Sequence, residues 1–339
     1  MGTGVYLVKE FVAGSKVVLE ANPKYWQTDK SKITYRHKAN VQTIEYQVIA
    51  ERAQHVIALQ TGAIDVSELV PLTSLADFQD GGKYADKYDV LQTIGSQVYA
   101  LLCNMYTGKV GSDINFRLAV WYAIDNEAVA KATGGLIFAS KAYGTPHFSD
   151  YVKAWGEKPN YINTFDPAKA KEYLAKTSYK GETLKLVAGA EEPFKTMVTV
   201  VQAFLKNIGI NTEIQLVSSK EMGPLFTNPE GFDIILPQHG GGSQIGEWNR
   251  ALNYNELKTD MSYGFIHDEK LQELFITART AATHSEATMT ALHEYIIEKA
   301  YHYAIGSPVI NLVYPNKMFD LVFRENEFLM PGACNYYLD

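Results

Sequence analysis

The sequence has few of the features that would assign a protein to a special structural class. Its 339 residues include only two cysteines, Cys103 and Cys334, too few to form a metal cluster. No apolar run approaches the roughly 20 residues of a transmembrane helix, and Met1 is not followed by the basic start and apolar core of a signal peptide. The net charge is −7 and no Lys- or Arg-rich run is present, which disfavours nucleic-acid binding. Cys103 lies in an apolar strand, so we expect a buried free thiol there.

A chain of this length exceeds most single hydrophobic cores and predicts two domains. The opening residues predict two short strands, because the β-forming residues Val5 to Leu7 and Val17 to Leu19 flank the turn residues Ala13 to Ser15. Asn22-Pro23 closes the second strand, since proline cannot donate a hydrogen bond to a sheet.

The middle of the chain predicts an α/β arrangement. A β-rich block with one or two helices extends to about Asn104, followed by helices near residues 113–133 and an irregular aromatic stretch, 136–165. From Leu184 to Leu236, strands alternate with helices, which implies parallel pairing and right-handed crossovers. The last predicted elements are helices over 268–283 and 285–303 and a strand over 308–314.

One motif, His239-Gly-Gly-Gly-Ser243, mimics the oxyanion loop of lipases. A lipase also needs a Gly-x-Ser-x-Gly nucleophile elbow, which this sequence lacks. A phosphate-binding loop is excluded too, because no Gly-Lys-Ser/Thr is present. Two alternatives remain: a flexible surface loop, or a loop that lines a ligand cleft after a strand's carboxyl end.

A second candidate is Glu191-Glu192, which precedes Phe194 between a strand and a helix. Acidic residues are favoured in a first helical turn by the macrodipole, so these carboxylates have a structural explanation as well as a ligand-binding one.

Four blocks, in order along the chain, carry a family resemblance. They are Gly2-Thr-Gly-Val-Tyr with Gly14-Ser-Lys-Val-Val-Leu-Glu-Ala-Asn-Pro-Lys-Tyr-Trp26, Arg52 with Ala58-Leu-Gln-Thr-Gly-Ala-Ile-Asp65, Arg117-x-Ala-x-x-Tyr-Ala-Ile-Asp125, and Asp166-Pro-Ala-Lys-Ala-Lys-x-Tyr-Leu174. Together they resemble the extracellular solute-binding proteins of family 5, the peptide and nickel receptors of ABC importers. In that family the first block follows a strand region and a further domain, so we expect this chain to lack the family's N-terminal portion.

The resemblance implies a periplasmic-binding-protein-like type II (cluster C) α/β fold with two lobes, built of mixed sheets with flanking helices. We expect residues 1–104 plus 311–339 to form an incomplete first lobe and residues 105–310 the second. Two strands, Val98–Asn104 and Ile310–Tyr314, would join the lobes as a hinge that closes around a ligand.

Peptide-binding relatives place a tryptophan and then an aspartate in the loop after the strand at Phe232. By the same count these places fall on His239 and near Gly242, and no carboxylate follows Asp233 until Glu247. Glu247 could replace the aspartate and Trp248 could form an aromatic wall. The expected ligand-binding residues are His239, Gly240, Gly242, Glu247, Trp248, Glu191, Phe194 and Asn311.

Nickel receptors of the family bind chelated metal through a histidine, which leaves His239 or His267 as alternatives. A lone histidine is more often structural, and we predict no metal ligand. His284, His293 and His302 recur every nine residues, which on a helix turns each about half a turn from the last. We therefore interpret them as ordinary helix residues.

The sequence thus predicts a binding protein with no catalytic residues and no cofactor. We expect a periplasmic or extracellular, membrane-associated monomer that captures a peptide-like or chelated-metal solute and delivers it to a membrane permease. The alternatives are an acyl-transfer hydrolase that uses the His239 loop, and a protein-interaction module that uses the Tyr-rich stretch 136–165.

Overall fold

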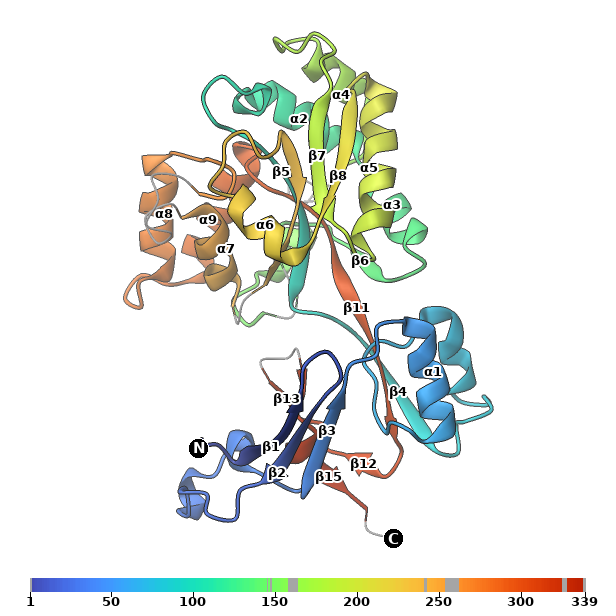
Figure 1. Cartoon of the computed structure of the whole chain (residues 1–339). Coiled ribbons are helices and arrows are strands. Elements are labelled where there is room, and N and C mark those ends of the chain that lie inside the picture. Colours follow the sequence, from blue (N-terminus) through green and yellow to red (C-terminus); the bar gives the residue numbers. More distant parts are fainter. Residues whose placement is uncertain are drawn as a thin grey trace. The chain divides into compact units, whose positions relative to one another are not determined.

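The computed structural model describes residues 2–144, 146, 148–157, 164–240, 243–253, 262–324 and 328–337. The chain divides into two compact units (Figure 1): unit 1 is Met1–Thr93 with Ile310–Asp339, and unit 2 is Ile94–Val309. Unit 2 is therefore inserted into the sequence of unit 1. The lobe limits expected from the sequence remain a prediction. In the described part of the chain, no helix combines the length and the hydropathy that a membrane span requires.

Unit 1 opens with an antiparallel sheet in the order β1-β2-β3. Its strands are β1 (Tyr6–Val12), β2 (Lys16–Ala21) and β3 (Thr43–Gln47). Gly14 in the first turn has a φ of 70°, a conformation that costs glycine nothing, and the predicted hairpin is confirmed. The other elements of this unit are α1 (Arg52–Thr61), β4 (Tyr88–Ile94), β12 (Met318–Phe319), β13 (Phe323–Arg324), β14 (Phe328–Leu329) and β15 (Asn335–Tyr336).

Unit 2 is built on a mixed sheet in the order β11-β5-β9-β7-β8, with β10 beside β5 and β6 beside β11. The strands are β5 (Gln97–Cys103), β6 (Ile137–Ala139), β7 (Leu184–Gly189), β8 (Thr212–Val217), β9 (Ile234–Leu236), β10 (Gln238–Gly240) and β11 (Tyr303–Pro315), the last of which continues into unit 1. β7 pairs in parallel with both β8 and β9, as the alternation of strands and helices predicted. β5 pairs antiparallel with β9, β10 and β11.

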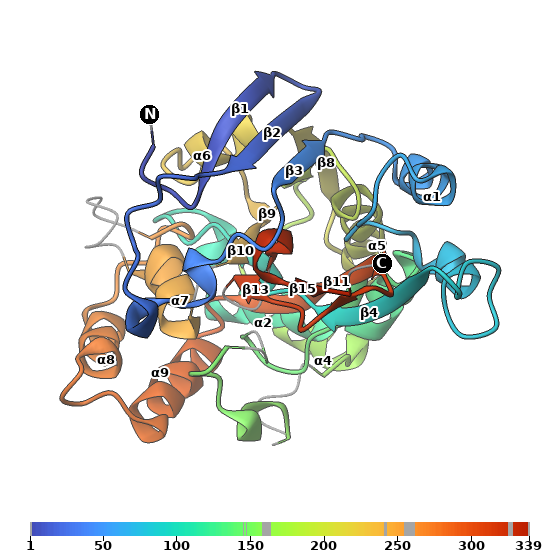
Figure 2. The same cartoon turned by 90° about the horizontal axis from the view of Figure 1, so that it is seen from below.

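Helices cover both faces of this sheet (Figures 1 and 2). They are α2 (Ile114–Ala123), α3 (Asn126–Ala132), α4 (Pro167–Leu174), α5 (Phe194–Ile208), α6 (Ser219–Leu225), α7 (Gln244–Leu252), α8 (Glu269–Arg279) and α9 (Glu286–Glu298). Helices α2 to α5 pack on one face, and α7 to α9 pack on the other.

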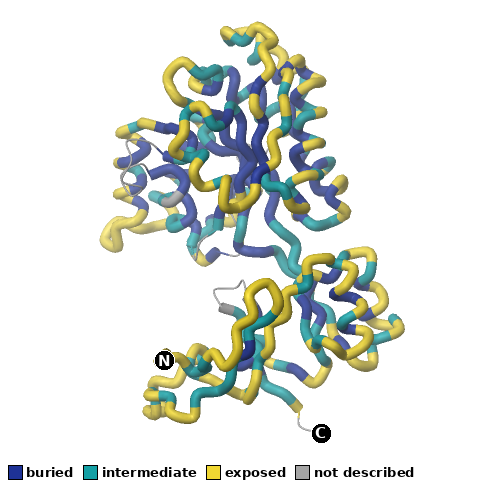
Figure 3. Tube along the Cα trace, in the orientation of Figure 1, coloured by how far each residue is buried: buried dark blue, intermediate teal, exposed yellow. Residues whose placement is uncertain are grey.

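Strand β5 shows why its sequence is apolar throughout. Side chains alternate along a strand, so Tyr99, Leu101 and Cys103 enter the core under α2 to α5. Val98, Ala100 and Leu102 enter the opposite core, under α7 to α9. A strand buried on both faces needs an apolar side chain at every position, and the central strands form the most buried part of unit 2 (Figure 3). The Cys103 thiol is free and buried, as predicted.

The end of the last predicted helix differs from the expectation. α9 ends at Glu298, because Ala300 adopts a left-handed backbone with a φ of 48°, and β11 begins at Tyr303. His302 therefore precedes a strand, and His284 lies between α8 and α9. The interpretation of the three histidines as helix residues is correct for His293 alone.

The aromatic stretch 136–165 contributes mostly to the core where the structure describes it. Tyr143, Phe148 and Trp155 are buried, whereas Phe138 is 44% exposed. Tyr161 lies outside the described residues.

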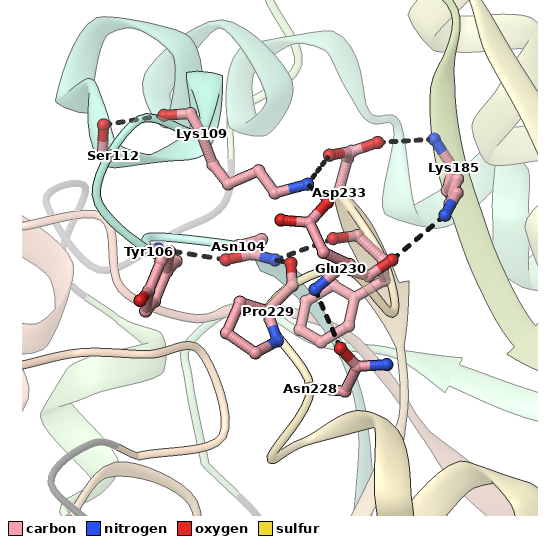
Figure 4. Close-up of polar contacts among 10 residues, drawn as sticks. Asn104, Tyr106, Lys109, Ser112, Lys185, Asn228, Pro229, Glu230 and Asp233 are labelled. Carbon is pink, nitrogen blue, oxygen red and sulfur yellow. Dashed lines mark hydrogen bonds and ion pairs between the residues drawn. The ribbon is translucent and has the colours of Figure 1, made fainter.

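A polar network joins the amino ends of β7 and β9 to the end of β5 (Figure 4). The buried Asn104 amide donates to the carbonyls of Pro229 (2.7 Å) and Phe232 (2.8 Å), and its oxygen accepts from the Tyr106 N–H (3.0 Å). Nearby, Asp233 accepts from the Lys185 N–H at 2.9 Å. These bonds fix the edge of the sheet opposite to the carboxyl ends of its parallel strands.

Candidate functional site

A pocket of about 230 Å³ lies at the carboxyl ends of the parallel strands β7 and β8. It is lined by Gly189, Ala190, Glu191, Phe194, Val217, Ser218, Ser219, Met222 and Gln238. Open α/β sheets bind their ligands at this edge, where strand ends turn into helices. Each of these described lining residues belongs to unit 2.

The local sequence explains how the pocket forms. The two strand ends are held together by the Ala190 N–H, which donates to the Val217 carbonyl at 2.9 Å. Helix α5 then starts at Phe194, whose ring packs edge-on against Tyr99 with centroids 5.2 Å apart. Position 189 must be glycine for this arrangement, because a Cβ there would lie 2.8 Å from Phe194 Cδ2.

The polar groups of the pocket come from two turns and from strand β10. Glu191 is exposed, and its neighbour Glu192 accepts a hydrogen bond from the Thr196 hydroxyl at 2.9 Å. The Ser218 hydroxyl and N–H both donate to Glu221, at 2.7 and 2.8 Å, which lowers the pKa of the Glu221 carboxyl.

The third group is Gln238, the first residue of β10, whose side-chain amide nitrogen donates to the Gln97 side-chain oxygen across the β10–β5 pair. Gly240 allows the two strands to approach, since a Cβ there would lie 2.7 Å from Gln97 Cγ.

The structure places two of the predicted ligand residues, Glu191 and Phe194, in this pocket. His239 and Gly240 lie next to it on β10, antiparallel to Val98 and Gln97. His239 and Gly240 therefore belong to a strand, so the predicted loop, whether at the surface or lining a cleft, is wrong for these two residues. Gly242 lies outside the described residues.

The His239 ring is buried beside other aromatic rings. It stacks on His302 at 5.6 Å and on Tyr263 at 6.0 Å between ring centroids. The His302 ring in turn accepts or donates a hydrogen bond at 2.7 Å with the Tyr143 hydroxyl.

Glu247 and Trp248 lie in helix α7, and both are buried. The Trp248 indole stacks on Tyr143 and Trp155, with centroid distances of 5.8 and 5.3 Å. This geometry places Trp248 in the hydrophobic core, not on an open wall. Burial is the main cause that raises the pKa of Tyr143, and the Glu247 carboxylate raises it further.

Asn311 belongs to unit 1, where both the nitrogen and the oxygen of its side-chain amide make hydrogen bonds. Its nitrogen donates to the Val70 carbonyl at 3.0 Å, and its oxygen accepts from Gln92 at 3.0 Å. These bonds give Asn311 a structural role within unit 1.

The histidines that the structure describes show no shared metal geometry. Among the described residues, no three His, Cys, Asp or Glu side chains are grouped as metal ligands. His267 is exposed. Burial lowers the pKa of His293 to about 3, against the opposing hydrogen bond with the Tyr143 backbone. Burial also holds the pKa of His302 well below its usual value, and His239 lowers it further.

Seven lining residues were not predicted from the sequence: Gly189, Ala190, Val217, Ser218, Ser219, Met222 and Gln238. Ser218 and Ser219 follow β8 as Glu191 follows β7. The strand-to-helix turn that predicted Glu191 therefore also occurs after β8. Gln238 directly precedes the His239 motif.

Comparison with known proteins identifies the family. The model for bacterial extracellular solute-binding proteins, family 5 Middle, matches residues 1–255. The chain belongs to this family.

Relatives of this family 5 chain include the periplasmic oligopeptide-binding protein OppA of Escherichia coli, 23% identical over 86% of this chain and 51% of OppA. Two solved structures share the fold. The oligopeptide-binding protein AppA of Bacillus subtilis, in complex with a nonapeptide, has a TM-score of 0.76 and 18% identity over 99% of this chain and 66% of AppA. NikA of Staphylococcus aureus, in complex with Ni(L-His)2, has a TM-score of 0.73 and 17% identity over 99% of this chain and 69% of NikA. This chain spans 51% to 62% of the length of the curated relatives that it matches.

Proposed function

We propose that this chain is the solute-capturing part of an extracellular or periplasmic binding protein that serves an ABC importer. The family match over residues 1–255 carries this proposal. The ligand would be a peptide-like solute or a chelated metal, since similar proteins are named for oligopeptides or were solved with a nonapeptide or Ni(L-His)2. The membrane permease of the importer would be the partner, and membrane association would follow from it.

The pocket beside β7 and β8 would hold one group of the ligand. Phe194, Val217 and Met222 provide apolar contact, while backbone and hydroxyl groups at Ala190 and Ser219 provide polar contact, which is the usual division in ligand sites. Capture would be completed by hinge closure, as the sequence suggested. The chain passes between the two units at residues 93–94 and 309–310, whereas the expected hinge strands Val98–Asn104 and Ile310–Tyr314 each lie inside one unit. A hydrolase gains no support, since the sequence lacks a nucleophile elbow.

Thermal unfolding in the presence of candidate solutes tests this function. A solute at about 100 times its dissociation constant should stabilise the chain by about 2.7 kcal/mol. The panel contains tripeptides, longer peptides, and nickel with histidine. We expect Ser219→Trp, which fills the pocket, to abolish the stabilisation.

Lys220→Trp is the matched control, because Lys220 is exposed on the same helix and does not line the pocket. It should retain the full effect. Equal stabilisation of both variants would move the binding site away from this pocket, and no stabilisation by any solute would refute the function for this chain.

A further inference from the structure

The charge of the pocket distinguishes among possible ligands. Of the described residues that line it, Glu191 is the only one whose side chain is charged at neutral pH. The remaining lining side chains are apolar, hydroxyl, thioether or amide groups. An anionic ligand group would face this carboxylate without a compensating cation in the lining.

The hydrogen-bonding groups of the pocket also favour a cationic ligand group over an anionic one. The Ser218 hydroxyl donates a hydrogen bond to the Glu221 carboxylate, and its oxygen faces the Glu221 N–H in the capping box of α6, which leaves one lone pair for a ligand. Gln238 donates one of its two amide N–H groups to Gln97, which leaves its carbonyl oxygen as an acceptor and its second N–H as a donor. With the Glu191 carboxylate, the pocket therefore offers acceptors, and an ammonium or guanidinium group is a donor with no acceptor capacity.

The apolar walls of the pocket fit the carbon chain that carries such a cationic group. Phe194, Val217 and Met222 provide apolar surface, against which the methylene stem of a lysine- or arginine-like side chain can lie while its charged end stays near the polar groups. The volume of about 230 Å³ is several times the roughly 30 Å³ that one water occupies.

We propose that this pocket selects solutes with a basic side chain or amine, with the cation held at Glu191 and the acceptors of Ser218 and Gln238. The inference rests on the proposed function and adds the class of substrate. Because Glu191 is exposed, its contribution should be that of a solvent-accessible ion pair, a preference of about fivefold that weakens with added salt.

Calorimetric titration of the full chain tests the inference with tri-alanine peptides in which each position in turn is replaced by lysine, norleucine or glutamate. Norleucine keeps the methylene stem of lysine without its charge. At one position or more, we expect lysine to bind about fivefold more tightly than norleucine, and glutamate more weakly than either. Glu191→Gln should reduce the lysine preference to near equality.

Glu192→Gln is the matched control. It makes the same charge change one residue away, at a carboxylate that bonds Thr196 and does not line the pocket. The preference should persist in this variant. Peptide binding with equal affinity for the three series, or a preference that survives Glu191→Gln, would overturn the cation site and leave the proposed function intact. Absence of binding by every peptide, and by nickel with histidine, would overturn both.

Discussion

His293 shows how a single buried side chain can make stability depend on pH. Its ring stacks on Trp155 at 4.2 Å, nearly parallel, in the core under α7 to α9. The packing holds the imidazole neutral, with a pKa of about 3 against roughly 6.5 in an unfolded chain. Between these values only the unfolded state binds the proton, so stability falls as the pH falls from about 6.5 towards 3, by about 1.4 kcal/mol per pH unit.

We expect the free energy of unfolding of His293→Phe to depend less steeply on pH, because the variant lacks one site that binds a proton only in the unfolded chain. Urea unfolding of both proteins at several pH values between 7 and 4.5 measures this dependence. Some of it should persist in the variant, because the pKa of His302 is also lowered. An unchanged slope in His293→Phe would mean that His293 is protonated in the folded chain.

At the scale of elements, the turn from β7 into α5 determines the shape of the pocket. A methyl group at position 189 would press on the Phe194 ring, so Gly189→Ala should force that ring away from Tyr99. Overpacking of this kind costs about 1–3 kcal/mol and should also weaken solute binding. Lys220→Ala, at an exposed position of α6, is the control and should change stability by less than about 0.5 kcal/mol. Unfolding and titration of both variants give the comparison, and a neutral Gly189→Ala would contradict the packing argument.

The same elements show how much the sequence could predict. The run from Leu184 to Leu236 alternates between strand and helix periods, so the parallel strands and the turn that carries Glu191 and Phe194 were predictable. Trp248 was not, because its burial depends on Tyr143 and Trp155, which lie about a hundred residues away in the sequence. β10 was missed because a strand of three residues, Gln238–Gly240, is too short to show a periodicity of its own.

For the whole molecule, the division into two units predicts two unfolding transitions. In the described part of the chain, each hydrophobic cluster is confined to one unit: two lie in unit 2 and two in unit 1. Units that share no core can unfold separately, and a single two-state transition is then not expected. Leu59 is buried in a unit 1 cluster, and Asn104 anchors unit 2 through its bonds to Pro229 and Phe232.

Differential scanning calorimetry of two variants tests this division. Leu59→Ala should leave a cavity that destabilises unit 1 by about 3 kcal/mol and lower one transition temperature only. Asn104→Ala should cost unit 2 about 2–3 kcal/mol, since buried carbonyls lose their donor, and lower the other transition only. A solute that binds the pocket should raise the transition that responds to Asn104→Ala, because the described lining residues all belong to unit 2. If both variants lowered a single shared transition by similar amounts, the two units would be one cooperative structure, and the pocket could not be treated as the property of one of them.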